Sequence, residues 1–253
     1  MLSEERRSKI VQLVRENGKV RVRELSDTFN ISEVTIRNDL KELQLRGLLM
    51  RAHGGAIQPD TIVVEPSLQE RIRSHAEEKR RIGAAAAELV EDGDSIILDS
   101  GSTTQEIAKR IKGKRNLKVI TNGVNIAMEL IAVPGIQLIL LGGVLRENSF
   151  SVVGHFAENM LEHLYADKLF IAADGVDVGF GLSTPNLEES QVNQAMVRIA
   201  RQKILVAVSS KFGKRSLSRI GALSEMNKIV TDPALPEQIQ HDLRARGMEI
   251  IFA

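Results

Sequence analysis

The strongest constraint on the fold lies in residues 31–47, where the sequence marks both ends of a single helix. Ser32 is a favourable N-cap, Glu33 places negative charge in the first turn, and Gly47 suits the C-cap position. At about 100° per residue, the helix has one apolar stripe, formed by Ile36, Leu40 and Leu43. Such a helix is stabilised by packing its stripe against other elements, so the segment predicts a small helical domain.

The opposite face of this helix carries side chains that hydrogen-bond to bases and phosphates. It consists of Val34, Asn38 and Lys41, with Thr35 and Arg37 beside them. The formal net charge of the whole chain is only +1, yet basic residues gather close to this helix at Arg37, Lys41, Arg46 and Arg51. The pattern indicates a local basic patch of the kind that binds nucleic acid.

Two shorter helices precede this one. Apolar residues repeat at helical spacing in residues 4–17 and again in residues 23–29. Asn30 breaks the second helix just before the restart at Ser32, which gives the order helix, tight turn, helix. Residues 48–56 begin with apolar side chains and contain a Gly-Gly turn, a pattern that suits a small β-wing.

We therefore expect a winged helix-turn-helix domain over residues 1–57 that binds double-stranded operator DNA. Periodicity alone would fit a plain three-helix bundle equally well, but the polar outer face and the basic wing favour DNA binding. The residues expected to contact DNA are Ser32, Glu33, Thr35, Arg37, Asn38, Lys41, Arg51 and His53.

The remaining length of this 253-residue chain is enough for a second, larger domain. Residues 58–75 lose clear periodicity and contain two prolines, so they predict a linker. The absence of cysteine excludes disulfides and thiolate metal sites, and the histidines lack ligand spacing. No apolar run reaches the length of a membrane helix. We expect a soluble cytoplasmic protein without a cofactor or a metal site.

Residues 76–253 alternate apolar runs with helical stretches. The runs are residues 95–98, 118–121, 136–141, 168–173, 204–208, 228–231 and 249–252. Near-continuous apolar strands separated by helices are typical of a mostly parallel sheet that is covered on both faces. The second domain is therefore predicted to be α/β.

Polar loops follow several of these strands, at the edge where open α/β sheets bind ligands. Residues 99–104 follow the first strand and combine a glycine with hydroxyl groups and the start of a helix, which together suit a phosphate. A turn of this kind is also an ordinary helix cap. Later turns bring further polar groups to the same edge: Thr121, Asn122, Gly142, Gly143, Arg146, Asp174, Thr184, Glu189 and Lys211.

Motifs in both domains resemble those of the DeoR-type bacterial transcriptional repressors. In the first domain they are Val20, Val22 and Leu25, then Ile31, Ser32, Thr35, Ile36, Arg37, Asp39 and Leu40, and then Arg51, His53, Gly54, Gly55 and Ala56. In the second they are Asp99, Gly101, Thr103, Thr104, Thr121, Asn122, Gly142, Gly143, Arg146, Thr184, Glu189, Ser210, Lys211 and Phe212. Many members have a second arginine at the position of Asn38. The sequence Thr-Ile-Arg-Asn-Asp-Leu found here resembles that of the N-acetylgalactosamine-utilisation repressors.

The resemblance implies that residues 76–253 are a sensor domain similar in fold to the ribose-phosphate isomerase and glucosamine-phosphate deaminase group. Such a domain would bind a phosphorylated sugar through Asp99, Gly101, Ser102, Thr103, Thr104, Thr121, Asn122, Gly142, Gly143, Arg146, Asp174, Thr184, Glu189 and Lys211. Residues 101–104 would hold the phosphate, while Asp174, Glu189 and Lys211 would contact the sugar or its neighbours.

The function that the resemblance implies is a repressor of a carbohydrate catabolic operon, with an amino-sugar operon as one candidate. A bound sugar phosphate would release the repressor from its operator. A homodimer or homotetramer is expected, because one small winged helix has limited contact area and paired half-sites multiply the affinity.

Two alternatives remain open from the sequence. Residues 174–177 resemble a stretch of the ribose-phosphate isomerases, which leaves a sugar-phosphate isomerase or deaminase-like enzyme with a DNA-binding domain as one alternative. The Lys-Gly-Gly-Gly run that follows in those enzymes is missing here, so the chain lacks the cation that would stabilise an enediolate. The other alternative is a constitutive DNA-binding protein whose α/β domain binds no ligand.

Overall fold

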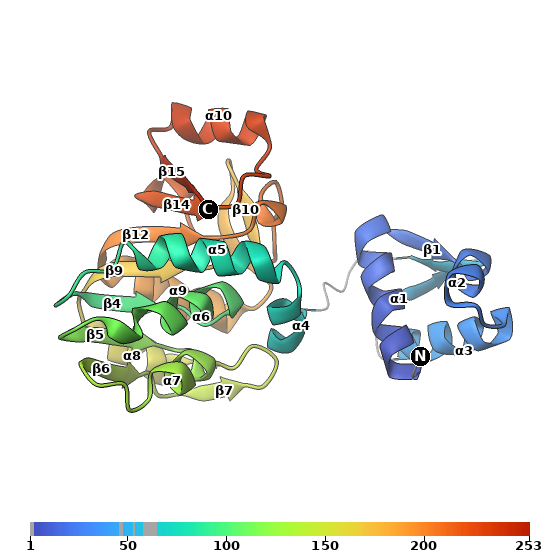
Figure 1. Ribbon diagram of the computed structural model, residues 1–253, viewed down its shortest axis with the longest axis horizontal. Helices are drawn as coiled ribbons and strands as arrows, with labels where there is room; N and C mark the ends of the chain where they lie inside the picture. The colour runs from blue at the N-terminus through green and yellow to red at the C-terminus, as the bar shows by residue number, and fades with distance from the viewer. Residues whose placement is uncertain (1–2, 46–47, 53, 58–64) are drawn as a thin grey trace. The chain divides into compact units, whose positions relative to one another are not determined.

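The computed structural model describes residues 3–45, 48–52, 54–57 and 65–253, and it divides the chain into two compact units, Met1–Glu65 and Pro66–Ala253 (Figure 1). The first unit has three helices and a three-stranded antiparallel sheet of order β1-β3-β2. Its elements are α1 (Ser3–Asn17), β1 (Lys19–Arg21), α2 (Val22–Phe29), α3 (Glu33–Leu45), β2 (Met50–Ala52) and β3 (Gly55–Ile57). This is a helix-turn-helix followed by a β-hairpin.

Helix α3 is the capped helix expected from the sequence. The backbone N–H of Thr35 donates to the Ser32 hydroxyl at 3.3 Å, so Ser32 acts as the N-cap. The stripe of Ile36, Leu40 and Leu43 is buried in an apolar cluster with residues of α1, α2 and β1. The expected C-cap Gly47 and the expected DNA contact His53 lie outside the described residues, as does Arg46.

A buried carboxylate also fastens α3 to α1. Asp39 is only 2% exposed, and it accepts from Nε of Arg6 at 2.6 Å and from Nε of Arg7 at 2.9 Å. The hydrogen bond to Asp39 raises the pKa of Arg7, because the ionised carboxylate favours the charged guanidinium. The position of α3 in the first unit therefore depends on a two-arginine clamp as well as on apolar packing.

The second unit is built around a seven-stranded sheet whose hydrogen-bonded pairs are all parallel. Its spatial order is β15-β14-β12-β9-β4-β5-β6. The strands are β4 (Ser95–Leu98), β5 (Leu117–Thr121), β6 (Ile136–Leu140), β9 (Ala166–Ile171), β12 (Ala200–Val206), β14 (Lys228–Thr231) and β15 (Glu249–Phe252). Each corresponds to one predicted apolar run, so the prediction of a mostly parallel α/β sheet is confirmed.

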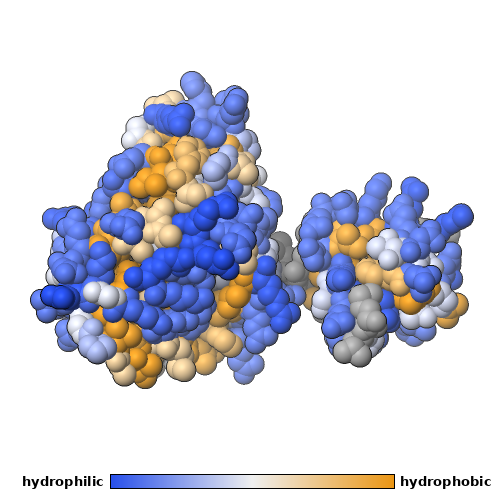
Figure 2. All heavy atoms as spheres, in the orientation of Figure 1, coloured by the Kyte–Doolittle hydropathy of each residue, from blue (hydrophilic) through white to orange (hydrophobic). Residues whose placement is uncertain are grey.

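Helices cover both faces of this sheet and enclose two apolar clusters. One face is covered by α5 (Ala76–Ala87), α6 (Ser102–Arg110) and α7 (Val124–Leu130), and the other by α8 (His155–Glu162) and α9 (Leu187–Ile199) (Figure 1). The outward surface over α5 and α6 is hydrophilic (Figure 2). The amphipathic helices thus bury their apolar sides against strands that are apolar on both faces.

Several short elements of the second unit were not predicted from the sequence. They form the hairpin β7 (Val144–Arg146) and β8 (Ser151–Val153) and an antiparallel sheet of β10 (Gly175–Asp177), β11 (Gly181–Thr184) and β13 (Ser218–Gly221). The others are the 3₁₀ turns η1 (Ile111–Gly113), η2 (Ser209–Lys211) and η3 (Leu223–Glu225). Helix α10 (Glu237–Ala245) lies between the last two predicted strands, where a helical stretch was expected.

The prediction of a linker over residues 58–75 is wrong for residues 68–73, which form helix α4 (Leu68–Arg73). A capping box of Ser67 and Glu70 starts this helix, and Leu68 is buried. This helix is difficult to predict from the sequence, because it is shorter than two turns and closely follows Pro66. Residues 58–64 lie outside the described part of the chain.

The clamp on Asp39 gives a stability prediction for the first unit. Replacing Asp39 with Ala leaves two arginines without their buried counter-ion, so we expect a loss of about 3 kcal/mol in the free energy of unfolding of that unit. Urea denaturation of the full chain, followed through the transition of the first unit, measures it. Asp27→Ala, at an exposed aspartate of α2, is the control and should change stability by less than about 0.5 kcal/mol. Equal stabilities of the two variants would contradict a structural role for the clamp.

Candidate DNA-binding face and ligand site

The outer face of α3 presents an exposed set of side chains. Arg37, Asn38 and Lys41 are exposed, and Arg37 forms an ion pair with Glu33 one turn earlier. Val34 lies on the same face with 63% of its surface exposed. An exposed valine next to exposed hydrogen-bonding groups fits the edge of a thymine, whose methyl group is the apolar feature of the major groove. Arg51 is exposed on β2 of the wing.

Ser32 and Thr35 serve the helix itself. The Ser32 hydroxyl caps the helix and lies 2.9 Å from the Thr35 hydroxyl. Sequence reasoning grouped both with the DNA-contacting residues. Val34 was placed on this outer face from the sequence but was not counted among the expected DNA contacts, although it lies one turn from Asn38.

The strand order of the second unit defines the edge at which an open α/β sheet can bind a ligand. From β4 the chain proceeds outward through β5 and β6, then returns to place β9 on the other side of β4. The loops after β4 and β9 therefore leave the sheet in opposite directions, which opens a topological switch point where α/β proteins bind ligands. We call residues 99–104 and 172–174, which follow these two strands, the switch-point site. Asp99 bridges its two loops, because its Oδ2 accepts from the backbone N–H of Ala172 at 3.3 Å.

The first loop of the switch-point site ends at the N-terminus of α6. Gly101 precedes the helix at φ 147°, which a side chain would strain, and it offers no side chain to cap the helix. Ser102 and Thr103 are nearly buried, and within the described part of the chain their hydroxyl groups have no hydrogen-bond partner. The helix start thus leaves N–H and O–H donors without acceptors, as anion sites at helix termini do.

An unpartnered amide lies beside the same loop. Asn122 is fully buried, and its Oδ1 accepts from the backbone N–H of Ser100 at 2.9 Å. Its Nδ2 has no partner among the described residues. A buried donor without an acceptor is costly, so the amide supplies a second, independent reason to expect an acceptor at this position.

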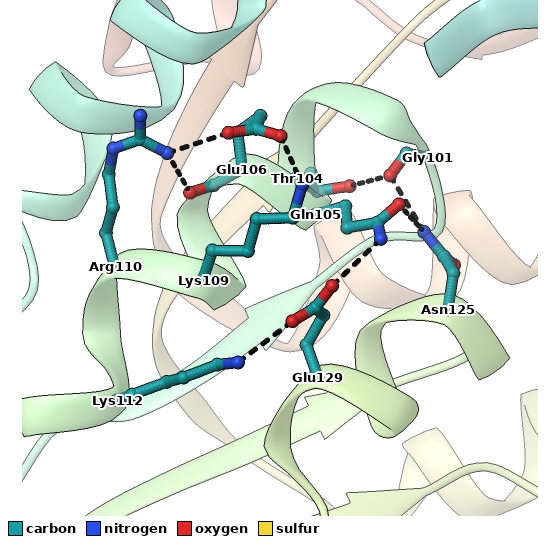
Figure 3. Close-up of polar contacts among 9 residues, drawn as sticks. All are labelled: Gly101, Thr104, Gln105, Glu106, Lys109, Arg110, Lys112, Asn125 and Glu129. Atoms are coloured by element: carbon teal, nitrogen blue, oxygen red, sulfur yellow. Dashed lines mark hydrogen bonds and ion pairs between the residues drawn. The ribbon is translucent and has the colours of Figure 1, made fainter.

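Contacts between α6 and α7, shown in Figure 3, fix the loop that precedes α6. The carbonyl oxygen of Gly101 accepts from the Thr104 hydroxyl at 3.2 Å and from Nδ2 of Asn125 at 3.0 Å. Nε2 of Gln105 in turn donates to Glu129 at 3.1 Å. Thr104 therefore supports the loop with its hydroxyl group, and this geometry fixes the position of the helix start.

A second polar network is centred on Glu189, at the start of α9. Its carboxylate accepts from Ser151 at 2.6 Å and from Thr184 at 3.2 Å, and it pairs with Arg146 at 2.5 Å. Asn193, with its amide nitrogen turned toward the surrounding acceptors, joins the two clusters by donating to Oδ1 of Asp99 at 3.2 Å. The hairpin β7–β8 and helix α9 are thereby connected to the switch-point site.

Burial and the nearby Glu189 carboxylate raise the pKa of Asp99 to about 8. Asp99 is 3% exposed, and the two backbone N–H groups of Ala172 and Ser100 only partly offset the loss of hydration. At neutral pH this carboxyl group is therefore mostly protonated.

The remaining predicted residues divide into three groups. Asp174 and Lys211 form an ion pair at 2.9 Å that joins the second loop of the switch-point site to η2. Thr121 is fully buried and bonds to the Leu98 carbonyl and the Gly123 N–H, so it holds the strand ends. The described contacts of Gly142 and Gly143 are made with Met160 and the end of β8, and none is made with residues 99–104.

Sequence reasoning missed two basic residues near this edge, Arg71 on α4 and Lys79 on α5. The charge of Arg71 acts on both Asp99 and Lys79, and the charges of Lys211 and Asp174 act on Lys79. Arg71 fell in the segment taken as a linker, and Lys79 precedes the first strand. No spacing in the sequence could place either of them here.

The described residues contain no helix that combines the length and the apolar character needed to span a membrane. Nor do they bring together three His, Cys, Asp or Glu side chains in a way that could hold a metal ion.

Comparisons with known proteins match both units. A model of the DeoR-like helix-turn-helix domain matches residues 6–61, and one of the DeoR C terminal sensor domain matches residues 74–233. The chain is 38% identical to the putative aga operon transcriptional repressor of Escherichia coli O157:H7, over 98% of this chain and 93% of that protein. It is 30% identical to the glycerol-3-phosphate regulon repressor of Escherichia coli K12, over 99% of each.

Solved structures similar to this chain match about half of it. A D-ribose-5-phosphate isomerase in complex with phospho-erythronic acid aligns over 54% of each chain with a TM-score of 0.41 and 16% identity. The eIF2B delta subunit of Chaetomium thermophilum aligns over 64% of this chain and 57% of its own, with a TM-score of 0.45 and 17% identity.

The raised pKa of Asp99 gives a pH prediction. In the unfolded chain this carboxyl ionises near pH 4, whereas in the folded chain it ionises near pH 8, so its contribution to stability is lost as the pH rises between these values. The free energy of unfolding of the wild type should therefore fall by up to about 1.4 kcal/mol per pH unit more steeply than that of Asp99→Asn. Urea denaturation from pH 5 to pH 8 measures it, with Glu88→Gln at an exposed position as the control. The same pH slope in Asp99→Asn and the wild type would show that Asp99 ionises normally.

Proposed function

This chain belongs to the DeoR family of DNA-binding transcriptional repressors, and we propose that a phosphorylated sugar bound at its switch-point site releases it from a carbohydrate catabolic operon. One observation carries the ligand half of this proposal. The start of α6 leaves its donors open at a topological switch point, beside the unpartnered amide of Asn122. Phosphate is the group that such a set of donors binds best.

The sugar itself would lie toward the polar groups that surround the helix start. The Glu189 carboxylate with Arg146, and Asp174 with Lys211, offer acceptors and donors for several hydroxyl groups. The 38% identical relative is described as a putative aga operon repressor, which supports testing amino-sugar phosphates first. The 30% identical relative supports glycerol 3-phosphate as a second probe.

The DNA half of the proposal rests on the outer face of α3. Arg37, Lys41 and Arg51 would contact phosphates, whereas Asn38 and Val34 would reach base edges in the major groove. Two copies of the chain would bind two half-sites, as a homodimer or within a homotetramer.

Release would follow from linkage between the two units. We assume that the sugar phosphate binds better to an arrangement of the second unit that disfavours operator binding. Bound sugar phosphate then lowers the affinity for operator DNA, and bound operator lowers the affinity for sugar phosphate by the same factor.

We predict different effects for two substitutions on α3. Arg37→Ala should weaken binding on all DNA sequences alike and reduce the slope of log affinity against log salt by about one per copy, because it removes a phosphate contact. Asn38→Ala should change base preference at one position of each half-site, at a cost of about 1–3 kcal/mol on the preferred sequence. Selection from a randomised operator at two salt concentrations distinguishes them, with exposed Lys118→Ala of the second unit as the control. An unchanged base preference in Asn38→Ala would refute its assignment.

For the second unit, we predict that Thr103→Val abolishes the response to ligand while operator binding stays normal. The substitution removes one of the open hydroxyl groups at the start of α6 and keeps the side-chain volume. Operator binding is titrated with galactosamine 6-phosphate, N-acetylgalactosamine 6-phosphate, glycerol 3-phosphate and unphosphorylated galactosamine. Thr103→Ser, which keeps the hydroxyl, should still respond. A normal response in Thr103→Val would place the ligand elsewhere, and turnover of a probe by the purified protein would favour the enzyme alternative.

A further inference from the structure

Lys79 is a buried lysine without a carboxylate partner. It is 7% exposed, and its ammonium group donates to the backbone carbonyl of Arg71 and to that of Ser74 at 2.7 Å. Among the described residues it forms no ion pair. Lys168, which is 9% exposed, shows the usual arrangement, because its ammonium lies 2.6 Å from the carboxylate of Asp94. Burying an unpaired cation is costly, so the position of Lys79 calls for a function.

The surroundings of Lys79 raise that cost further. Burial lowers its pKa to about 8, and the charges of Lys211 and Arg71 lower it in the same direction. Asp174 and Glu78 act in the opposite direction but do not compensate. An anion bound beside Lys79 would remove this imbalance.

The packing of α5 on α6 places Lys79 beside the start of α6. The two helices touch at Gly83 and Glu106, so closely that a Cβ on Gly83 would lie 2.4 Å from the Cβ of Glu106. Both helices connect to strands of a parallel sheet, one before β4 and one after it, and they therefore run in the same direction (Figure 1). About one turn back from the contact, α5 carries Lys79 and α6 carries Ser102.

We propose that Lys79 supplies the positive charge for the phosphate held at the start of α6. This inference rests on the proposed function, and it adds a residue from another helix to the binding site. The open N–H and hydroxyl donors of residues 102–103 give the cradle its shape, whereas the loop of residues 99–101 brings no cation of its own. Lys79 provides that cation from α5, as a point charge at the rim of the phosphate.

The same contact joins the ligand to α4. The ammonium of Lys79 holds the carbonyl groups at the C-terminal end of this helix, and the backbone N–H at its other end, from Leu68, donates to the Asn148 carbonyl at 2.8 Å. Helix α4 is the first helix of the second unit, which begins at Pro66. A phosphate that binds the ammonium of Lys79 therefore competes with the carbonyl groups of α4 for its hydrogen bonds. Helix α4 is the first helix that follows the DNA-binding unit along the chain.

Calorimetric titration of the full chain tests the proposal, with galactosamine 6-phosphate, glycerol 3-phosphate and inorganic phosphate as probes. Lys79→Met should weaken binding of the probe that the wild type binds by at least tenfold, while operator affinity without a probe stays unchanged. Lys109→Met, at an exposed lysine of α6, removes the same charge and should bind like the wild type. Lys79→Arg keeps the charge and should retain most of the affinity. Thermal denaturation checks that each variant folds.

The pH dependence separates a charge contact from a merely structural role. Anion binding by the wild type should weaken above about pH 8, where Lys79 loses its proton, and Asp99, which gains negative charge in the same range, adds to the effect. In an Asp99→Asn background the decline should remain, and adding Lys79→Arg should remove it. Equal affinities of wild type and Lys79→Met would overturn the role of Lys79 alone. A wild type that binds none of the probes would overturn the proposed function and this inference together.

Discussion

The architecture of the second unit depends on the topological switch point between β4 and β9. These neighbouring strands belong to the two halves of a parallel sheet, and the loops that follow them turn to opposite faces. Asp99 spans the gap, with its backbone N–H on the Phe170 carbonyl at 3.1 Å and its carboxyl on the Ala172 N–H. The loop and helix start proposed to bind the phosphate lie at this point, because the strand ends and helix starts of a parallel sheet meet at one edge.

This edge holds polar groups that a purely structural core would avoid. The carboxyl of Asp99 is buried with a raised pKa, the amide of Asn122 lacks an acceptor among the described residues, and Lys79 lacks a counter-ion there. Each feature costs free energy in the free protein. The proposed anion at the start of α6 would give the lysine a counter-ion. A site that is destabilised when empty can use ligand binding to favour a different arrangement of the elements around it.

The sequence predicted those parts of the fold that follow from local patterns. The seven strands of the large sheet are near-continuous apolar runs, and α3 has both a capping serine and one apolar stripe. Short strands such as β7 and β10 have only three residues each, which is too few to show an alternating pattern, although each pairs with the next strand along the chain. Asp39 shows a similar limit, because nothing near it in the sequence reveals that Arg6 and Arg7 fold over it.

The ligand site was predicted in the same uneven way. The loop of residues 99–104 is recognisable from its glycine, its hydroxyl groups and its place after a strand. Lys79 is not recognisable, because its position beside α6 depends on the packing of α5 on α6, which includes the close approach of Gly83 to Glu106 and a shared apolar cluster. Thr121 and Thr104 have the residue type of a ligand contact, yet their hydroxyl groups hold the backbone of the strand end and the loop.

In the proposed mechanism, sugar phosphate and operator compete through the same conformational equilibrium. The most direct test measures the affinity of the sugar phosphate for the free protein and for the operator-bound protein, and compares their ratio with the change that saturating sugar phosphate causes in operator affinity. Linkage requires the two factors to be equal, and we expect each to exceed tenfold. A sugar phosphate that binds free and operator-bound protein with the same affinity would contradict it.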